Sequence, residues 1–358
     1  MDPPGGPLAR EADRTPRPAD SSGMRGYIAA LIGFLSAVLL AATGATGAMG
    51  TTATAVADDP AFGSRLYVDP YSDAQAAYNQ LTAGGDTATA ALIGQIAGQP
   101  TAVWLGDWYS PTLLLSVIQR HLAAAAAQGA TPVFVTYAIP DRDCGGYSAG
   151  GFTADQYLDW NRRVAAALAG SHAVVLIEPD SLAMLSSAKC AGVAATRLPL
   201  IHSAVDILAG AGLVTYLDGG NARWLTPDAQ AAYLKAAGIA GARGFFTNVS
   251  NFDTTQTERD YAGKVSSRVG WKHFVIDVSR NGDGWTGTWC NPPGAALGQN
   301  PQITQSATSK LDALLWVKHP GASDGPCNGG PSAGAWFESG AEALVLGRAA
   351  QAPSSTST

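Results

Sequence analysis

The sequence predicts one α/β domain built as a parallel (α/β) barrel of about seven strands, and two observations carry this prediction. Seven short apolar runs recur from residue 62 onward, and alanine-rich segments of helical period separate them. The runs are apolar almost throughout, which is typical of parallel strands whose sheet is covered on both faces. About seven strand–helix units suit a closed or nearly closed barrel, with a doubly wound open sheet as the alternative.

The predicted strands lie within these apolar runs. In chain order they are AVWLGDW (102–108), PVFVTYAIPDRD (132–143), AVVLIEPD (173–180), LVTYLDG (213–219), GFFTNVSN (244–251), HFVIDVSRN (273–281) and LLWVKHPGASD (314–324). Candidate helices between them are SVIQRHLAAAAAQG (116–129), ADQYLDWNRRVAAALAG (154–170), LIHSAVDILAGAG (200–212) and DAQAAYLKAAG (228–238). Strands that alternate with helices predict crossover connections and a parallel sheet.

The composition excludes several classes of protein. Hydrophobic residues make up 46% of the 358 residues and charged residues 14%, which suits a folded soluble domain rather than a disordered chain. The net charge is −6, so the chain has no basic surplus with which to bind nucleic acid. We therefore expect no nucleic-acid partner, and we expect a monomer.

The N-terminal region predicts export. Residues 27–42 are apolar and uncharged, follow Arg25, and lead through small residues to a candidate cleavage site at Ala55, Val56 and Ala57. We expect a cleaved signal peptide and a secreted protein, because this run is shorter than the ~20 residues that span a bilayer. The alternative is a membrane anchor over residues 27–50.

The chain accordingly divides into three parts. They are an N-terminal extension with the export signal or anchor (1–57), one folded domain (58–350) and a polar tail (351–358). Met24 directly precedes the basic residue of the signal, so the natural start is either Met1 or Met24. We expect no second domain, because no Pro/Thr-rich linker leads into a Trp-rich module.

The four cysteines predict two disulfides. All of them lie in the part expected to be exported, and an even number in an oxidising compartment favours pairing. Their order suggests Cys144 with Cys190 and Cys290 with Cys327, although four cysteines allow three pairings. No two cysteines or histidines show the spacing of zinc ligands, so we expect neither a metal nor a cofactor.

Polar residues end every apolar run. Because the carboxyl ends of parallel strands meet at one face of a barrel, we expect these side chains to converge there. The alternative is that they cap the helices that follow. Several acids with few bases among them favour a site where one carboxyl stays protonated, and such a group is a general acid. The residues are Asp107, Asp141, Asp143, Asp180, Asp218, Asn248, Asn251, Asp277, Lys318 and Asp324.

Aromatic residues accompany these strand ends. Their faces stack on the apolar faces of sugar rings, so the set favours a polysaccharide cleft. Carboxylates and stacking surfaces on an exported acidic protein indicate hydrolysis of a neutral glycan. The aromatic residues are Trp104, Trp108, Tyr137, Trp224, Trp285, Trp289 and Trp316.

Six motifs together resemble the glycoside hydrolase family 6 cellulases in order and spacing, over nearly all of residues 62–347. They are YAIPDRDCGGYSAGG (137–151), VVLIEPDSL (174–182), YLDGGNARWL (216–225), VIDVSRNG (275–282), WCNPPGAALG (289–298) and LLWVKHPGASDG (314–325). The resemblance implies a distorted parallel barrel whose tunnel or cleft is framed by two disulfide-tied loops, with the pairing suggested above. It also implies that the protein hydrolyses β-1,4-glucan with inversion.

The resemblance assigns roles to the acids by motif position. Asp180 matches the general acid, and Asp143 matches the neighbouring carboxylate that raises the pKa of that acid and orders the water chain. Asp324 matches the residue proposed as base or as water-organising partner, and Asp218 matches a further acid of the site. Glu178, two residues before Asp180, is expected to be a structural partner of a basic residue such as Arg142.

The resemblance also implies the substrate-binding residues. Tyr137 matches the tyrosine that presses on the distorted sugar, and Trp104, Trp224 and Trp289 match stacking platforms. Lys318 matches a hydroxyl-binding lysine. Ser148 or Ala149 matches the water-binding serine of a mobile loop. Asn248, at the end of its apolar run, is a further candidate for contact with the substrate.

Two positions depart from the family pattern. The chain has DGGN where the family usually has DAGH, so Asn221 replaces a sugar-binding histidine. It has PGASDG where the family usually has a glutamate, so Ala322 replaces a residue that binds a sugar hydroxyl. Each replacement is expected to weaken binding by ~1–3 kcal/mol.

The loop lengths favour endo action. Only PCNGG (326–330) separates Asp324 and Gly325 from PSAGAWF (331–337), which predicts an open cleft and cleavage of internal bonds. Two other functions stay possible at this point. One is a glycan-binding relative that has lost catalysis, and the other is a serine esterase that uses Ser148 in GYSAG (146–150) with His202, His273 or His319.

Overall fold

The computed structural model describes residues 60–304 and 309–351. The predicted export segment, its cleavage site, both candidate start methionines and residues 352–358 of the polar tail lie outside the described residues. In the described ranges, no helix combines the length and the apolar character needed to cross a membrane.

The core of the domain is an eight-stranded sheet in the order β1-β2-β3-β4-β5-β6-β8-β7. Seven strands run parallel to one another, and the two-residue β7 pairs antiparallel with β8. All seven predicted strands are confirmed, whereas β7 was not predicted. The strands are β1 (Val103–Gly106), β2 (Val133–Tyr137), β3 (Val174–Ile177), β4 (Val214–Asp218), β5 (Gly244–Thr247), β6 (His273–Asp277), β7 (Gln302–Ile303) and β8 (Leu311–Leu315).

The strands of the curled sheet send alternate residues into two separate apolar clusters. One set, which includes Val135, Tyr216 and Leu315, packs together inside the curl. The other set, which includes Phe134 and Phe245, packs beneath the helices. A single main-chain hydrogen bond of 3.1 Å, from the Ala102 amide to the Trp316 carbonyl, joins the start of β1 to the end of β8. The predicted distorted barrel is confirmed in the form of a curled, mostly parallel half-barrel, and the sequential strand order is not that of a doubly wound sheet.

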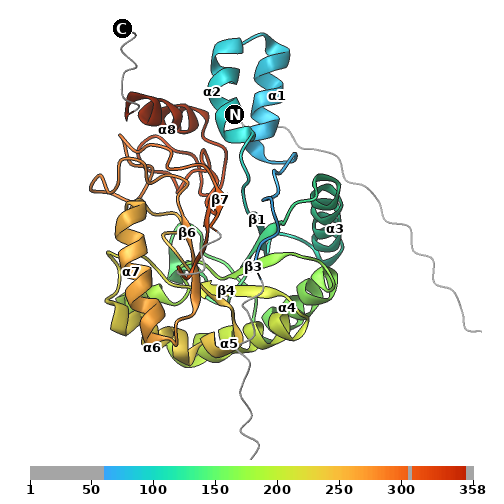
Figure 1. The fold of residues 1–358 in the computed structure, drawn as a ribbon, viewed down its shortest axis with the longest axis vertical. Coiled ribbons are helices and arrows are strands. Elements are labelled where there is room, and N and C mark those ends of the chain that lie inside the picture. Colours follow the sequence, from blue (N-terminus) through green and yellow to red (C-terminus); the bar gives the residue numbers. More distant parts are fainter. Residues whose placement is uncertain (1–59, 305–308, 352–358) are drawn as a thin grey trace, which may run out of the picture. The chain divides into compact units, whose positions relative to one another are not determined.

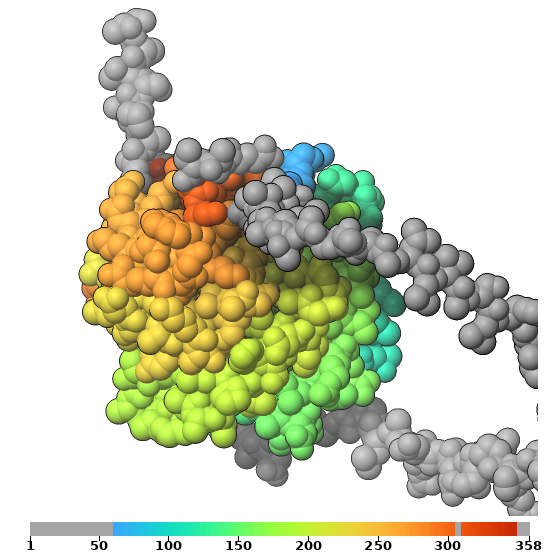
Figure 2. Space-filling model, turned by 60° about the horizontal axis from the view of Figure 1, so that its bottom comes forward, coloured from blue at the N-terminus to red at the C-terminus, as the bar shows by residue number. Residues whose placement is uncertain are grey.

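Helices cover the outside of the barrel, as the ring of α3 to α7 around the strands shows (Figure 1). In the space-filling view, residues coloured from green to orange, which include α4 to α7, form a continuous surface (Figure 2). The four predicted helices are confirmed, although α5 begins at Ala194 rather than at residue 200. The helices are α1 (Asp73–Gly84), α2 (Thr87–Ala97), α3 (Pro111–Gln128), α4 (Ala154–Leu168), α5 (Ala194–Gly210), α6 (Pro227–Ala236), α7 (Thr255–Arg268) and α8 (Glu338–Gln351).

Serine and threonine, not the strand-end acids, cap the helices that follow the strands. Side-chain oxygens of Ser110, Thr153, Thr226 and Thr254 accept the first-turn amides of α3, α4, α6 and α7. Such caps satisfy amides that have no partner within the helix. The alternative reading of the acids as helix caps is therefore wrong for these four helices.

Two disulfides tie loops at the carboxyl face of the barrel. Cys144 and Cys190 join the loops after β2 and β3, and Cys290 and Cys327 join the loops after β6 and β8. Both predicted pairings are confirmed.

Candidate active site

Asp180 follows β3 on strained backbone. Its φ is 68°, and Asp143 after β2 has a φ of 59°. Positive φ is uncommon outside glycine and gathers at functional sites, where the surrounding structure holds it in place. The loop ends that carry these two acids are thus held in defined positions.

The predicted acids converge around Asp180. Burial raises the pKa of Asp180 well above its ordinary value, and the negative charges of Asp218 and Asp143 raise it further. The positive charge of Lys318 opposes these effects, and Asp324 adds a smaller increase. Charges have such effects only at short range, so these residues from four strand ends share one site. This environment favours the protonated form of the Asp180 carboxyl.

Asp218 holds the turn that follows Asp180. Its side chain is 2% exposed. One oxygen accepts the amides of Leu182 and Ala183 at 3.0 and 3.1 Å, and the other accepts the Gly220 amide at 3.0 Å. The hydrogen bonds of Asp218 are thus made to the main chain, and its negative charge raises the pKa of Asp180.

Asp143 lies in a tight loop after β2. Its Oδ2 accepts the Ser148 amide at 2.7 Å. A Cβ at Gly146 would lie 2.3 Å from the same oxygen, so the loop requires glycine there. Burial, followed by the charges of Asp180 and Asp143, raises the pKa of Tyr137 far above its ordinary value. Tyr137 is therefore a neutral hydroxyl beside both acids.

Arg142 fixes the base of this loop. Its guanidinium donates to Asp107 at 2.5 Å, to the Tyr137 carbonyl at 2.7 Å and to the Ser148 carbonyl at 2.8 Å. Asp107 in turn accepts the Gly151 amide at 2.7 Å. The side-chain partner of Arg142 is thus Asp107.

Glu178 does not form the expected ion pair. It is fully buried, and its carboxylate accepts the amides of Ala138 and Ile139 at 3.0 to 3.1 Å. Burial raises its pKa to about 7 despite these hydrogen bonds. The predicted pairing with Arg142 is wrong, because the glutamate instead ties the end of β2 to the end of β3.

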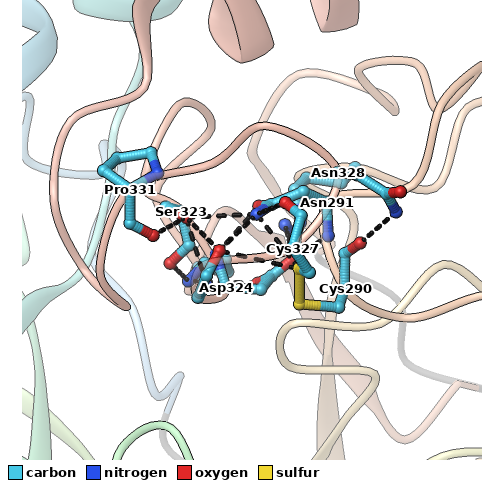
Figure 3. Close-up of a disulfide and its surroundings, with 10 residues drawn as sticks. Cys290, Asn291, Ser323, Asp324, Cys327, Asn328 and Pro331 are labelled. Atoms are coloured by element: carbon cyan, nitrogen blue, oxygen red, sulfur yellow. Dashed lines mark hydrogen bonds and ion pairs between the residues drawn. A yellow bond between two sulfur atoms is a disulfide. The ribbon is translucent and has the colours of Figure 1, made fainter.

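Asp324 is held by two cations and a main-chain amide. Arg280 donates to its Oδ2 at 2.8 Å, and the Lys318 ammonium lies 3.3 Å from its Oδ1. Asn291 donates its amide to Oδ2 and accepts the Asp324 amide, both at 2.9 Å, beside the Cys290–Cys327 disulfide (Figure 3). Burial alone would raise the pKa of Asp324, but the two cations and these hydrogen bonds hold it below its ordinary value. Neither Arg280 nor Asn291 was among the site residues predicted from the sequence.

The predicted sugar-stacking residues come from several strands and loops: Trp104 lies in β1, Trp224 after β4 and Trp289 after β6. Trp104 donates to the Val317 carbonyl at 2.8 Å and meets Tyr137 edge to face, with ring centroids 5.1 Å apart. Trp289 is exposed, and Trp224 is half-buried. Trp316 is 1% exposed and packs in the core beneath the helices, so its predicted place in the cleft is wrong.

Asn248 is a structural residue rather than a substrate contact. It is fully buried. Its amide nitrogen donates to the carbonyls of Asp253 and Asp277, both at 3.0 Å, and its oxygen accepts the Asp253 amide. With both amide hydrogens used inside the protein, the side chain joins the loops after β5 and β6.

The positions that depart from the family pattern also lie in these loops. Asn221 is buried and accepts the Arg223 amide at 3.0 Å. Ala322 is half-buried and forms an isolated antiparallel bridge with Trp336.

The histidines needed by an esterase have other partners. His273 is the first residue of β6, at the opposite end of the barrel, and bonds Asp312 at 2.8 Å. His202 on α5 lies near Asp206, and His319 bonds the Ala102 carbonyl at 2.5 Å. Ser148 therefore lacks the arrangement that a serine nucleophile requires. Among the described residues, no three His, Cys, Asp or Glu side chains are grouped to hold a metal ion.

An acid whose pKa is raised, close to other carboxylates and aromatic rings at the carboxyl face of a parallel barrel, is typical of a glycosidase site. The chain matches the family described as Glycosyl hydrolases family 6 over residues 61–348, and it belongs to that family.

Similar proteins bear names that agree with this class. Endoglucanase A of Cellulomonas fimi is 42% identical over 275 residues, which cover 77% of this chain and 59% of that protein. Endoglucanase A of Thermobispora bispora is 36% identical over 304 residues, which cover 82% of this chain and 65% of that protein. The chain thus spans less than two thirds of either relative.

A solved structure supports the same family. It is the endoglucanase Cel6 from Mycobacterium tuberculosis in complex with methyl-cellobiosyl-4-deoxy-4-thio-β-D-cellobioside. The TM-score is 0.74 and the identity 39%, and the match covers 80% of this chain and 98% of that chain.

Proposed function

We propose that the protein is an inverting endo-β-1,4-glucanase that hydrolyses internal bonds of cellulose or related β-glucans, with Asp180 as the general acid. The observation that carries this proposal is the raised pKa of Asp180, caused by burial and by the charges of Asp218 and Asp143. The endoglucanase names of the relatives and the cellobiose-type ligand of the Mycobacterium tuberculosis structure support it.

In the proposed reaction, Asp180 gives its proton to the glycosidic oxygen as the bond from that oxygen to the anomeric carbon breaks. A water molecule attacks the anomeric carbon from the opposite face, which inverts its configuration. The proton that this water loses passes to a carboxylate. Inverting enzymes keep the two carboxyl groups ~6.5–9.5 Å apart to make room for the water.

Asp143 is the better candidate to receive this proton. Asp324 is ion-paired with Arg280 and Lys318, and cations that stabilise a negative charge make the carboxylate a weaker base. Asp143 accepts a main-chain amide from Ser148 instead. Asp218 is proposed to keep the Asp180 turn in position through the amides of Leu182 and Ala183.

The surrounding side chains are proposed to hold the glucan. The Tyr137 ring stands at the cleavage point, where it contacts the distorted sugar, and Ser148 binds the attacking water. Trp104, Trp224 and Trp289 stack on neighbouring glucosyl units. Lys318 binds a sugar hydroxyl while it stays paired with Asp324. We also propose secretion, supported by the sequence of residues 27–57.

The test compares Asp180→Asn with the wild type in reducing-sugar release from barley β-glucan. Loss of a general acid is expected to lower kcat by about 10²–10⁴-fold. Asp155→Asn, at an exposed position in the first turn of α4, is the matched control and should keep full activity. Equal, negligible rates for the wild type and Asp180→Asn would instead favour a glycan-binding relative without catalysis.

A separate measurement, the viscosity of carboxymethylcellulose, tests endo action. The wild type should lower the viscosity of carboxymethylcellulose early in the reaction, because each internal cut shortens the polymer strongly. Release of cellobiose without a fall in viscosity would contradict endo action. Proton NMR of fresh product should show the α-anomer first.

A further inference from the structure

Tyr147 contacts residues on the opposite side of the site. We call the loop after β2, which carries Asp143, the Asp143 wall, and the loops after β6 and β8, which carry Trp289 and Asp324, the Asp324 wall. Tyr147 lies in the loop after β2, between Asp143 and Ser148, and is 53% exposed. Its ring centroid is 6.0 Å from that of Trp289, and the planes are tilted by 40°. The ring also packs against Gly325, because a Cβ built there would lie 2.4 Å from its Cδ2.

These contacts cross the site. Trp289 directly precedes Cys290 after β6, and Gly325 directly follows Asp324 after β8. Tyr147 therefore joins the wall that carries Asp143 to the wall that carries Asp324, and Asp180 responds to the charges of both. One aromatic side chain thus contacts residues that follow two other strands of the barrel.

Neither wall depends on this contact for its position. The Tyr147 loop is fixed by the Arg142–Asp107 pair and by the Cys144–Cys190 disulfide. The other wall is fixed by the second disulfide and by Asn291. The Tyr147 ring, with half of its surface exposed, is not required to bury either wall.

We propose that Tyr147 is a further substrate-contacting residue, which forms with Trp289 a two-ring surface for one glucosyl unit and selects for slender glucan chains. This inference rests on the proposed function. Trp289 is 51% exposed, so both rings offer apolar area to the same unit. Rings stack on the apolar face of a sugar, whereas bulky substituents would meet Gly325 and the ring that covers it.

The experiment measures kcat/KM of the wild type and Tyr147→Ala on cellotetraose and on carboxymethylcellulose. We expect Tyr147→Ala to lose about 5- to 10-fold on cellotetraose, the effect of one aromatic contact, and to lose less on the substituted polymer. Tyr147→Phe keeps the ring that makes the contacts and should recover most of the loss seen in Tyr147→Ala. Tyr71→Ala removes a tyrosine of similar exposure near α1 and should change neither value.

Two further readouts separate substrate contact from loop support. The effects of Tyr147→Ala and Trp289→Ala should be less than multiplicative when combined, because the rings share one unit. The pH profile of Tyr147→Ala should keep the limits of the wild type, since Asp143 stays bound to the Ser148 amide. An unchanged substrate ratio, or a shifted pH limit, would overturn the proposal.

Binding distinguishes this inference from the proposed function. Calorimetry of cellotetraose with Asp180→Asn and with Asp180→Asn/Tyr147→Ala does not depend on turnover. If the wild type hydrolyses nothing but Tyr147→Ala weakens binding, the glucanase assignment fails and the Tyr147 contact stands. If both proteins bind equally, the Tyr147 contact is wrong whatever the activity.

Discussion

The two walls beside Asp180 each present a carboxylate, but they hold it in opposite ways. Asp324 is paired with Arg280 and Lys318 and accepts the Asn291 amide. Asp143 instead accepts a main-chain amide from Ser148 within its own loop. The charge of Asp324 is thus neutralised by neighbouring cations, whereas Asp143 is positioned by the main chain.

This difference separates a structural acid from an acid that acts on its neighbour. A negative charge paired with cations has little effect beyond the pair, whereas one held by amides is felt by other groups. Burial and Asp218 are the largest causes that raise the pKa of Asp180; after them, Asp143 contributes more than Asp324, and Lys318 opposes these charges. We infer that the Asp143 wall influences the proton on Asp180, whereas the Asp324 wall supports the structure of the loops around the site.

The largest expected effect is the loss of stability when each carboxylate is removed in turn, and it tests the difference between the two walls. Asp324→Ala leaves Arg280 buried without its partner and should lower the free energy of unfolding by about 3–5 kcal/mol. Asp143→Ala removes one amide hydrogen bond and should cost about 1 kcal/mol. Urea unfolding at pH 7 measures both, and equal losses would contradict the division between the walls.

A smaller effect concerns the pH dependence of stability. Burial raises the pKa of Glu178 to about 7 and that of Glu258 to about 8, from an ordinary value of 4.5. Between these limits the folded state binds more protons than the unfolded state, so the unfolding free energy should fall as pH rises. Each group contributes about 1.4 kcal/mol per pH unit within its window.

Urea unfolding at pH 5, 6, 7 and 8 tests this sign. The wild type should be more stable at pH 5 than at pH 8. Glu178→Gln should flatten the curve below about pH 7, and Glu258→Gln should flatten it up to about pH 8. A stability that rises through this range would show that these carboxyls are ionised when folded.

The fold could be predicted because its strands are buried on both faces. Such strands are continuously apolar, and all seven parallel ones stand out in the sequence. The two residues of β7 are not buried and give no such signal. Helix α5 begins at Ala194, before the apolar residues that recur with helical spacing. It also contains Pro199, and a proline in the sequence usually indicates a helix boundary.

The site could be predicted only in part, because strand ends show which side chains converge but not which partners they choose. Asp180, Asp143 and Asp324 follow from their positions at the ends of strands. Arg280 lies 44 residues before the aspartate that it binds, and no spacing rule connects the two. Asn248 has the same sequence signal as a substrate contact, yet its amide is used to join two loops.

The central claim is that burial and the charges of Asp218 and Asp143 raise the pKa of Asp180. The pH dependence of kcat tests the contribution of Asp143 most directly. Asp143→Asn removes that charge with little change of shape, and Asp155→Asn is the surface control. The upper limit of the profile reports the acid in the bound complex, so Asp143→Asn should move it to lower pH while the control leaves it in place. An upper limit that stays at the wild-type pH in Asp143→Asn would contradict the account.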